Sequence, residues 1–400
     1  MKEISLMIIR RLRENENGQL CEVESLGFLY SANVRDAAEE TLKSEVYGAF
    51  LDDDQTLMSA IYTPEYHSWC GDITLPSVGI GGVATRPEYR RGGGIRAVFE
   101  KIFQLAPERN WVTSTLYPFS FDYYRQFGYE RVFKVHTVTM QANVLSCFPR
   151  NTDAKLYTFR TPEMLADILQ VYNTYARRHG LMYARNEKTR AYSDDPFKSQ
   201  KMTYVHYDAD GKADAYATLS KDGEAMTVKD LAYIHADGLR GILGFIRTFD
   251  GQVSEYRFND LPSTADLDAV IHNYIDVGYE SDSCGMGRIL LLETLLQNWV
   301  YPTGTGHFRL RCDDFLEWNR AVWDVAYENG KGIVTKLPYD AEFDIAAGIA
   351  PLSRMIMEGG YSVRTASYLD GVEIRNGNAV ESEDFFRAFP AQDFYIHDRF

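Results

Sequence analysis

Apolar runs separated by short polar turns mark the first 140 residues of the chain. Tyr47–Leu51 and Leu57–Thr63 flank Asp52-Asp53-Asp54, which predicts a β-hairpin, and Lys134–Met140 alternates as a half-buried strand does. Further strands are predicted at Met7–Leu12, Ser77–Thr85 and Val112–Leu116, and helices at Ala32–Glu45, Arg96–Leu105 and Phe121–Phe127. This order of elements favours a mixed α/β domain with a partly parallel sheet.

A second α/β pattern follows Pro149–Asp153, a polar stretch that we interpret as a linker. Its predicted helices are Pro162–Arg178 and Leu239–Phe249, and its strands Met202–Tyr207, Ala213–Ser220 and Ala225–Ala232. The remaining pattern is α+β, with helices at 288–300, 349–359 and 382–389 and strands at 304–311, 318–327, 332–336 and 343–345. We therefore predict three domains, residues 1–150, 151–285 and 286–400.

Residues 83–96 carry the clearest chemical signal. The strand end Val83-Ala84-Thr85 is followed by Tyr89-Arg90-Arg91, three glycines (Gly92, Gly93, Gly94) and a helix that begins near Ile95. Backbone N–H groups at a helix N-terminus attract anions, and glycines let a phosphate approach closely. The pattern predicts a pyrophosphate site and differs from both the Walker A loop and the dinucleotide fingerprint. The alternative is a surface turn with a basic helix start.

A second segment downstream of this turn helps to interpret it: Tyr124-Arg125-Gln126-Phe127-Gly128-Tyr129-Glu130. Together the two segments resemble the GCN5-related N-acetyltransferases (GNAT), with Val83, Pro87, Tyr89, Arg90 and Gly93 in the order of that signature. Ile95 followed by Arg96, where most members have a small residue, is typical of the enhanced intracellular survival (Eis) family. That resemblance implies tandem GNAT-type mixed-sheet domains, the second degenerate, followed by an α+β domain similar to sterol carrier proteins.

The resemblance also implies roles for individual residues. Acetyl-coenzyme A would be the co-substrate, held by Val83, Ala84, Thr85, Arg90, Arg91, Gly92, Gly93, Gly94 and Ile95. Tyr124 would be the general acid, with Tyr123 as the adjacent alternative, and the α-carboxylate of Phe400 would be the general base. From the residues alone, Tyr124 could equally be an aromatic packing residue, and the aromatic C-terminal segment an ordered structural tail.

The net charge of the chain limits the kinds of ligand that we expect it to bind. The 57 acidic and 42 basic residues give a net charge of −15, which argues against a nucleic-acid partner and suits a cationic acceptor or simple solubility. We expect an acetyltransferase acting on an amine of a polyamine or an aminoglycoside-like compound. The alternatives are a protein lysine acetyltransferase and a lipid-binding protein with a vestigial GNAT domain.

The five cysteines are widely spaced, which predicts reduced thiols in a cytoplasmic protein and no metal site. No apolar run is long enough to predict a membrane span. The family resemblance further implies a homo-oligomer, a hexamer.

Overall fold

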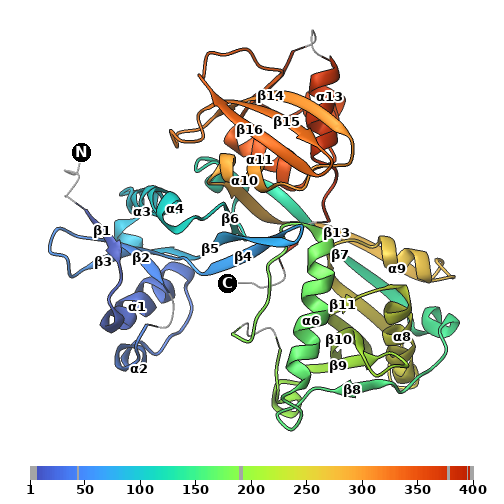
Figure 1. Cartoon of the computed structure of the whole chain (residues 1–400). Helices are drawn as coiled ribbons and strands as arrows, with labels where there is room; N and C mark the ends of the chain where they lie inside the picture. Colours follow the sequence, from blue (N-terminus) through green and yellow to red (C-terminus); the bar gives the residue numbers. More distant parts are fainter. Residues whose placement is uncertain (1–6, 43–44, 189–191, 376–378, 394, 397–400) are drawn as a thin grey trace.

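The computed structural model describes residues 7–42, 45–188, 192–375, 379–393 and 395–396 (Figure 1). Among them, no helix combines the length and the apolar character that crossing a bilayer requires. A long mixed sheet runs through the first two thirds of the chain, and a separate five-stranded sheet belongs to the last third. The predicted fold class, tandem mixed-sheet domains followed by an α+β domain, is confirmed in this arrangement.

The first third forms strands with helices on both faces. Its strands are β1 (Ile8–Arg11), β2 (Val46–Phe50), β3 (Leu57–Tyr62), β4 (Glu65–Cys70), β5 (Ile73–Thr85), β6 (Thr113–Leu116) and β7 (Glu130–Gln141). Its helices are α1 (Asn17–Phe28), α2 (Val34–Glu39), α3 (Gly94–Gln104), α4 (Ala106–Arg109) and α5 (Phe121–Arg125). Separate apolar clusters bury α1 and α3, because α1 packs on β3 and β5 from one side and α3 from the other.

Helix α1 was not predicted from the sequence. We expected a helix over Ala32–Glu45, and among the described residues of that range only the short α2, Val34–Glu39, is helical. In α1 itself, two of the three buried positions are Leu20 and Val23, and the third is a glycine. Two apolar positions and two glycines are too weak a periodic signal to predict a helix.

The second third repeats the pattern. Its strands are β8 (Ala154–Leu156), β9 (Met202–Tyr207), β10 (Ala213–Asp222), β11 (Ala225–Tyr233), β12 (Glu255–Leu261) and β13 (Val277–Ile289). Its helices are α6 (Met164–Ala176), α7 (Pro196–Ser199), α8 (Ala236–Ile246) and α9 (Ala265–Val270). The pattern analysis missed β12 and β13, and six consecutive residues of β13 are exposed, which explains why it gave no apolar signal.

The first and second thirds of the chain exchange strands in the long sheet. The sheet order is β1-β2-β3-β5-β6-β13-β7-β12-β11-β10-β9-β8, so β13 lies between β6 and β7, and β7 lies between β13 and β12. The C-terminal residues of β13 pair with β6 (Met286 with Leu116), while the C-terminal residues of β7 pair with β12 (Met140 with Tyr256). The strands of the first third are therefore completed by β13 from the second third, and the strands of the second third by β7 from the first (Figure 1).

The last third forms the sheet β16-β15-β14-β17-β18, covered by helices. The elements are α10 (Leu292–Asn298), β14 (Thr305–Asp313), β15 (Ala321–Glu328), β16 (Lys331–Leu337), β17 (Ile345–Gly348), α11 (Ile349–Met357), α12 (Val363–Ala366), β18 (Val372–Ile374) and α13 (Ala379–Ala388). The helix expected at Arg288–Val300 begins only at Leu292, because Arg288 belongs to β13. Phe308, Phe385 and Phe389 pack together in the core of this domain.

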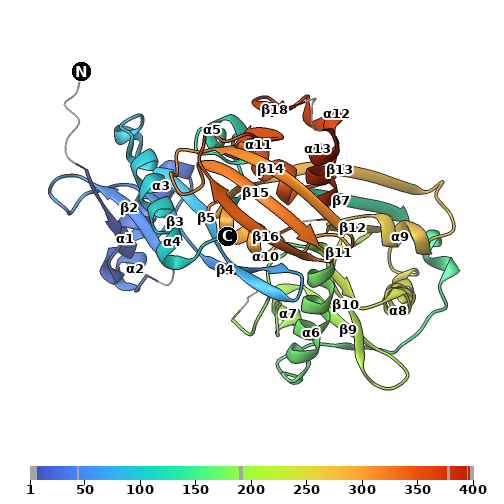
Figure 2. The ribbon, with the colours of Figure 1, turned by 45° about the horizontal axis from the view of Figure 1, so that its top comes forward.

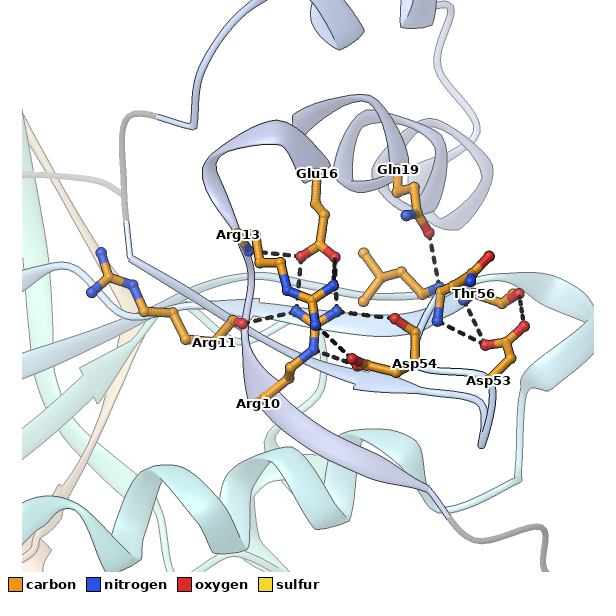
Figure 3. Close-up of polar contacts among 10 residues, drawn as sticks. Arg10, Arg11, Arg13, Glu16, Gln19, Asp53, Asp54 and Thr56 are labelled. Carbon is orange, nitrogen blue, oxygen red and sulfur yellow. Dashed lines mark hydrogen bonds and ion pairs between the residues drawn. The ribbon is translucent and has the colours of Figure 1, made fainter.

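A polar cluster fixes the start of α1 against the hairpin between β2 and β3 (Figure 3). Arg10 binds Glu16, just before α1, and Asp54 in the hairpin turn. The Asp53 carboxylate accepts hydrogen bonds from the backbone N–H groups of Gln55 and Thr56. In α1, the Gln19 side chain accepts a hydrogen bond from Leu57 N at 3.0 Å. The acidic turn is thus structural, and it helps to hold α1 in place on the sheet.

Candidate active site

Strands β5 and β6 separate where β5 reaches its C-terminal end. They pair in parallel from Ser77–Thr113 to Ile80–Leu116, and β6 then ends while β5 continues to Thr85. On the other side of β5, β3 stays paired as far as Thr85. Because Arg86 N–H donates to Met58 O in β3 and N–H directions alternate along a strand, the Thr85 N–H points to the open edge. This edge offers backbone donors to a ligand.

A β-bulge bends β5 at the same place. Between the pairs Ala60–Ala84 and Tyr62–Gly81, β5 has one more residue than β3. Gly82 lies in the bulge with φ +53°, and a Cβ atom there would come within 2.3 Å of the Tyr62 ring. Only glycine fits this conformation and this contact. The bulge therefore changes the direction of the β5 backbone at Val83 and Ala84, just beyond its last pair with β6.

The turn after β5 leads directly into α3. Arg91 (φ +63°) and Gly93 (φ +85°) adopt left-handed conformations, and Gly94 begins the helix. A Cβ atom on Gly94 would lie 2.6 Å from Ser59 Oγ, so the helix start can pack against the sheet only with glycine there. No side chain caps α3 among the residues described, which leaves its first backbone N–H groups for an anion.

A cavity of about 620 Å³ joins these features. All nine residues that were predicted to hold the co-substrate line it together: Val83, Ala84, Thr85, Arg90, Arg91, Gly92, Gly93, Gly94 and Ile95. The volume lies in the range of small-molecule and cofactor sites. The glycine turn leaves room for a diphosphate, and Arg90 and Arg91 supply charge, so the residues present fit coenzyme A.

Sequence reasoning missed part of the cavity wall. Gly27 and Phe28, at the end of α1, line it, as do Tyr89, Arg96, Phe119, Gln126 and Phe127. Phe28 is 52% exposed and Phe119 70% exposed, so both present apolar surface at the site. The apolar run Leu26–Tyr30, interrupted only by Gly27, is the sequence feature that accompanies this wall, but it has no helical period and does not predict α1.

The two candidate acids lie on α5, which Ser120 caps by accepting a hydrogen bond from Tyr123 N. Tyr123 lines the cavity, whereas Tyr124 is 3% exposed and packs edge-on against Phe99 and Phe119. Burial raises the pKa of the Tyr124 hydroxyl, so it keeps its proton at neutral pH. Tyr124 thus lies in the layer just behind the wall that Tyr123 forms.

A buried ion pair holds the segment that follows α5. Arg288 on β13 and Asp314 after β14 both have fully buried side chains, with Arg288 Nη2 2.7 Å from Asp314 Oδ1. Arg288 also donates through Nη1 to the carbonyl of Phe127, just beyond α5. Gly128 follows with φ +81°, and a Cβ atom there would clash with Arg288. In Figure 2, α5 lies beside α11 of the last domain, and Ile349 of α11 borders Gly128.

The C-terminal segment returns to the first domain. Tyr395 and Ile396 are buried, and the Tyr117 hydroxyl, one residue past the end of β6, donates a hydrogen bond to the Ile396 carbonyl. Phe400, the predicted general base, lies outside the described residues. The segment thus reaches the end of β6, where β5 and β6 separate, four residues before Phe400.

Within its described residues, the second domain does not repeat the site. Its strands β11 and β12 also pair in parallel, from Ala225–Glu255 to Val228–Phe258, but the cavity near their ends is only about 20 Å³, with Tyr395 in its wall. At the start of α8, His235 caps the helix itself by accepting a hydrogen bond from Gly238 N at 3.1 Å. Among the described residues, the open strand end and the uncapped glycine-rich helix start thus occur together in the first domain and not in the second.

Comparison of the sequence with protein-family models identifies the three domains. Two models described as acetyltransferase (GNAT) domains match residues 8–132 and 175–289. The chain belongs to the GNAT superfamily. A third model, described as a sterol carrier protein domain, matches residues 292–397 of this tandem GNAT protein. No curated protein matches its sequence.

Solved structures share the fold of this GNAT protein along its whole length. A probable N-acyltransferase from Enterococcus faecalis V583 is 20% identical with a TM-score of 0.81, covering 99% of this chain and 100% of the other. A GCN5-related N-acetyltransferase from Anabaena variabilis ATCC 29413 and Eis1 from Mycobacterium abscessus are each 17% identical with TM-scores of 0.78, and each covers 99% of this chain and 100% of its own. The tandem GNAT protein is an acyltransferase, and its GNAT domains imply acetyl-coenzyme A as co-substrate.

Proposed function

We propose that the protein transfers the acetyl group of acetyl-coenzyme A to an amine of a small cationic acceptor, a polyamine or an aminoglycoside-like compound. The observation that carries this proposal is the open end of β5 beside the glycine-rich start of α3, in one cavity of about 620 Å³. The net charge of −15 supports a cationic acceptor, because an acidic field concentrates cations near the protein.

In the proposed complex, the first turn of α3 with Arg90 and Arg91 holds the diphosphate. The Thr85 N–H and the bulged backbone at Val83 orient the pantetheine end. Acetyl-coenzyme A supplies the acyl group and the thiol leaving group. Burial raises the pKa of Tyr124, so its hydroxyl is protonated at neutral pH. In the proposed mechanism this proton goes to the departing thiolate, whose sulfur leaves as a thiol.

The proton of the acceptor amine goes to the α-carboxylate of Phe400. The position of Ile396 supports this part of the proposal, because its carbonyl is held at the end of β6 and a chain of four residues has a maximum reach of about 13 Å. We further propose, from the family resemblance alone, a cytoplasmic homo-oligomer, a hexamer.

Thiol release from acetyl-coenzyme A in the presence of spermidine, kanamycin or a lysine peptide tests the proposal. Turnover with the first two acceptors supports it, and turnover with the peptide alone would favour the protein-lysine alternative. Tight coenzyme A binding without turnover of any amine would contradict it. Failure to bind coenzyme A would leave the lipid-binding alternative, which lipid co-purifying with the protein would support.

Two adjacent substitutions identify the acid. Tyr124→Phe should lower kcat by about 100-fold or more while leaving the affinity for acetyl-coenzyme A within twofold, because general acid catalysis contributes about 10²–10⁴-fold. Tyr123→Phe is the matched control, with the same lost hydroxyl one residue away. A large loss of kcat in Tyr123→Phe alone would move the role to Tyr123. A residue added after Phe400 should also lower kcat, and full activity of that extended chain would exclude the terminal base.

A further inference from the structure

Glu24 lies on α1, on the opposite face of β5 from α3. Three residues later, Gly27 packs on β5 so closely that a Cβ atom would lie 3.0 Å from the Ala84 Cβ. Glu24 is therefore one helical turn before the cavity wall formed by Gly27 and Phe28. This turn places the Glu24 side chain beside the bulge of β5.

The bulge makes room for the Glu24 carboxylate. The Tyr62 hydroxyl donates a hydrogen bond to Oε2 at 3.2 Å. The other oxygen, Oε1, lies 3.0 Å from where a Cβ atom on Gly82 would be, so a side chain at Gly82 would displace it. Among the described residues, Oε1 accepts no hydrogen bond.

Glu24 also has no cationic partner within the described part of the chain. Glu22, two residues earlier on the same helix, forms an ion pair with Arg86. The titratable groups that the charge of Glu24 reaches are Tyr62 on β3 and, from α1 and the residues after it, Cys21 and Tyr30, and it raises the pKa of each. Burial raises the pKa of the Glu24 carboxyl, because desolvation disfavours its charged form and no cation in the described part of the chain offsets this effect. A bound cation would supply the missing countercharge.

We propose that Glu24 is the binding site for an ammonium group of the acceptor, a primary alkylammonium whose carbon chain lies against Tyr62 and Tyr30. This inference rests on the proposed acetyltransferase function and names the residue that selects a cationic acceptor. Oε1 supplies the charge-assisted hydrogen bond, and the tyrosine rings suit a cation and its methylene groups. The co-substrate cavity is lined by Val83 and Ala84, beside the bulge of β5, and by Gly27 and Phe28 of α1, so the two ligands would meet next to the bulge.

The test is a comparison of Glu24→Gln with the wild-type protein. Glutamine keeps an oxygen for the Tyr62 hydroxyl and removes only the charge. Isothermal titration calorimetry with spermidine, without acetyl-coenzyme A, should show a Kd about 10- to 100-fold higher in Glu24→Gln, as expected for one hydrogen bond to a charged group. The KM for spermidine should rise similarly, and the KM for acetyl-coenzyme A should stay within twofold.

Glu39→Gln is the matched control. Glu39 is an exposed residue of α2, and its substitution changes the net charge equally, so its Kd for spermidine should stay within twofold of wild type. Tyr62→Phe, which removes the hydroxyl that holds Oε2, should weaken spermidine binding by a smaller factor. This variant tests the site independently if Glu24→Gln fails to fold.

The outcomes separate this inference from the proposed function. An equal Kd in wild type and Glu24→Gln, or equal losses in Glu24→Gln and Glu39→Gln, would overturn the Glu24 site while amine acetylation by the wild type still stood. The absence of saturable spermidine binding to the wild type would also overturn it. Binding that depends on Glu24, in a protein that acetylates no amine, would keep the site and remove the acetyltransferase proposal.

Discussion

Removing the charge of Arg288 should damage both the fold and the proposed chemistry. Its guanidinium is fully buried, pairs with Asp314 and holds the Phe127 carbonyl beyond α5. Arg288→Met keeps a long, unbranched side chain but leaves the Asp314 carboxylate buried, with Asn319 Nδ2 as its remaining donor at 2.9 Å. Breaking a buried pair from one side costs about 3–5 kcal/mol, since an uncompensated charge remains.

Asp314→Asn should cost a similar amount, because it leaves the Arg288 cation buried. Burial already lowers the pKa of Arg288 despite the opposing effect of Asp314, which shows the desolvation that the carboxylate offsets. The double variant Arg288→Met/Asp314→Asn should lose less free energy of unfolding than the sum of the two single variants, because no charge is left unpaired.

Urea unfolding followed by tryptophan fluorescence measures these free energies, and thiol release measures activity at temperatures where each variant is folded. We expect kcat to fall more than the affinity for acetyl-coenzyme A, since Arg288 supports α5 and does not line the cavity. Single-variant losses below about 1 kcal/mol, or a double-variant loss equal to the sum, would refute the reasoning, because the pair would then behave as a solvated one.

Further predictions concern the cofactor turn and the acceptor side. Gly94→Ala should weaken coenzyme A binding and lower the free energy of unfolding, because the added Cβ atom would clash with Ser59 Oγ. Adding Ser59→Ala to the same chain should restore part of both. An unchanged affinity for coenzyme A in Gly94→Ala would contradict this reasoning. Glu24→Gln should be at least as stable as wild type at pH 7. The folded-state pKa of Glu24 is raised, so its contribution to stability is fully present below the unfolded pKa and is lost as pH rises through the folded pKa. The advantage of glutamine should therefore vanish below about pH 4 in thermal unfolding scans, and an advantage that persists there would show that charge is not its cause.

The position of the glycine-rich turn, between a strand and a helix, could be predicted from the sequence, whereas its role in holding coenzyme A stays a prediction. Gly93 is needed locally, because it adopts a left-handed φ, and such a need is visible in the sequence at the same place. The close contact that requires glycine at position 94 is with Ser59 on β3, so that requirement becomes visible only in the fold. The α1 wall was not predictable in this way, because Glu24 and Gly82 are far apart in sequence and meet only through the packing of α1 on the sheet. The role of Arg288 is likewise non-local, since its partners come from α5 and from the segment after β14.

The exchanged strands have a consequence for synthesis. The first sheet lacks its member between β6 and β7 until β13, ending at Ile289, has emerged from the ribosome, about 150 residues after the end of β7 at Gln141. At about 5–20 residues per second this delay lasts about 7–30 s. During that time β6 and β7 present open edges, which are templates for aggregation. Slow translation between Gln141 and Ile289 should therefore lower the soluble yield, and the two acetyltransferase domains should mature together rather than in the order of their synthesis.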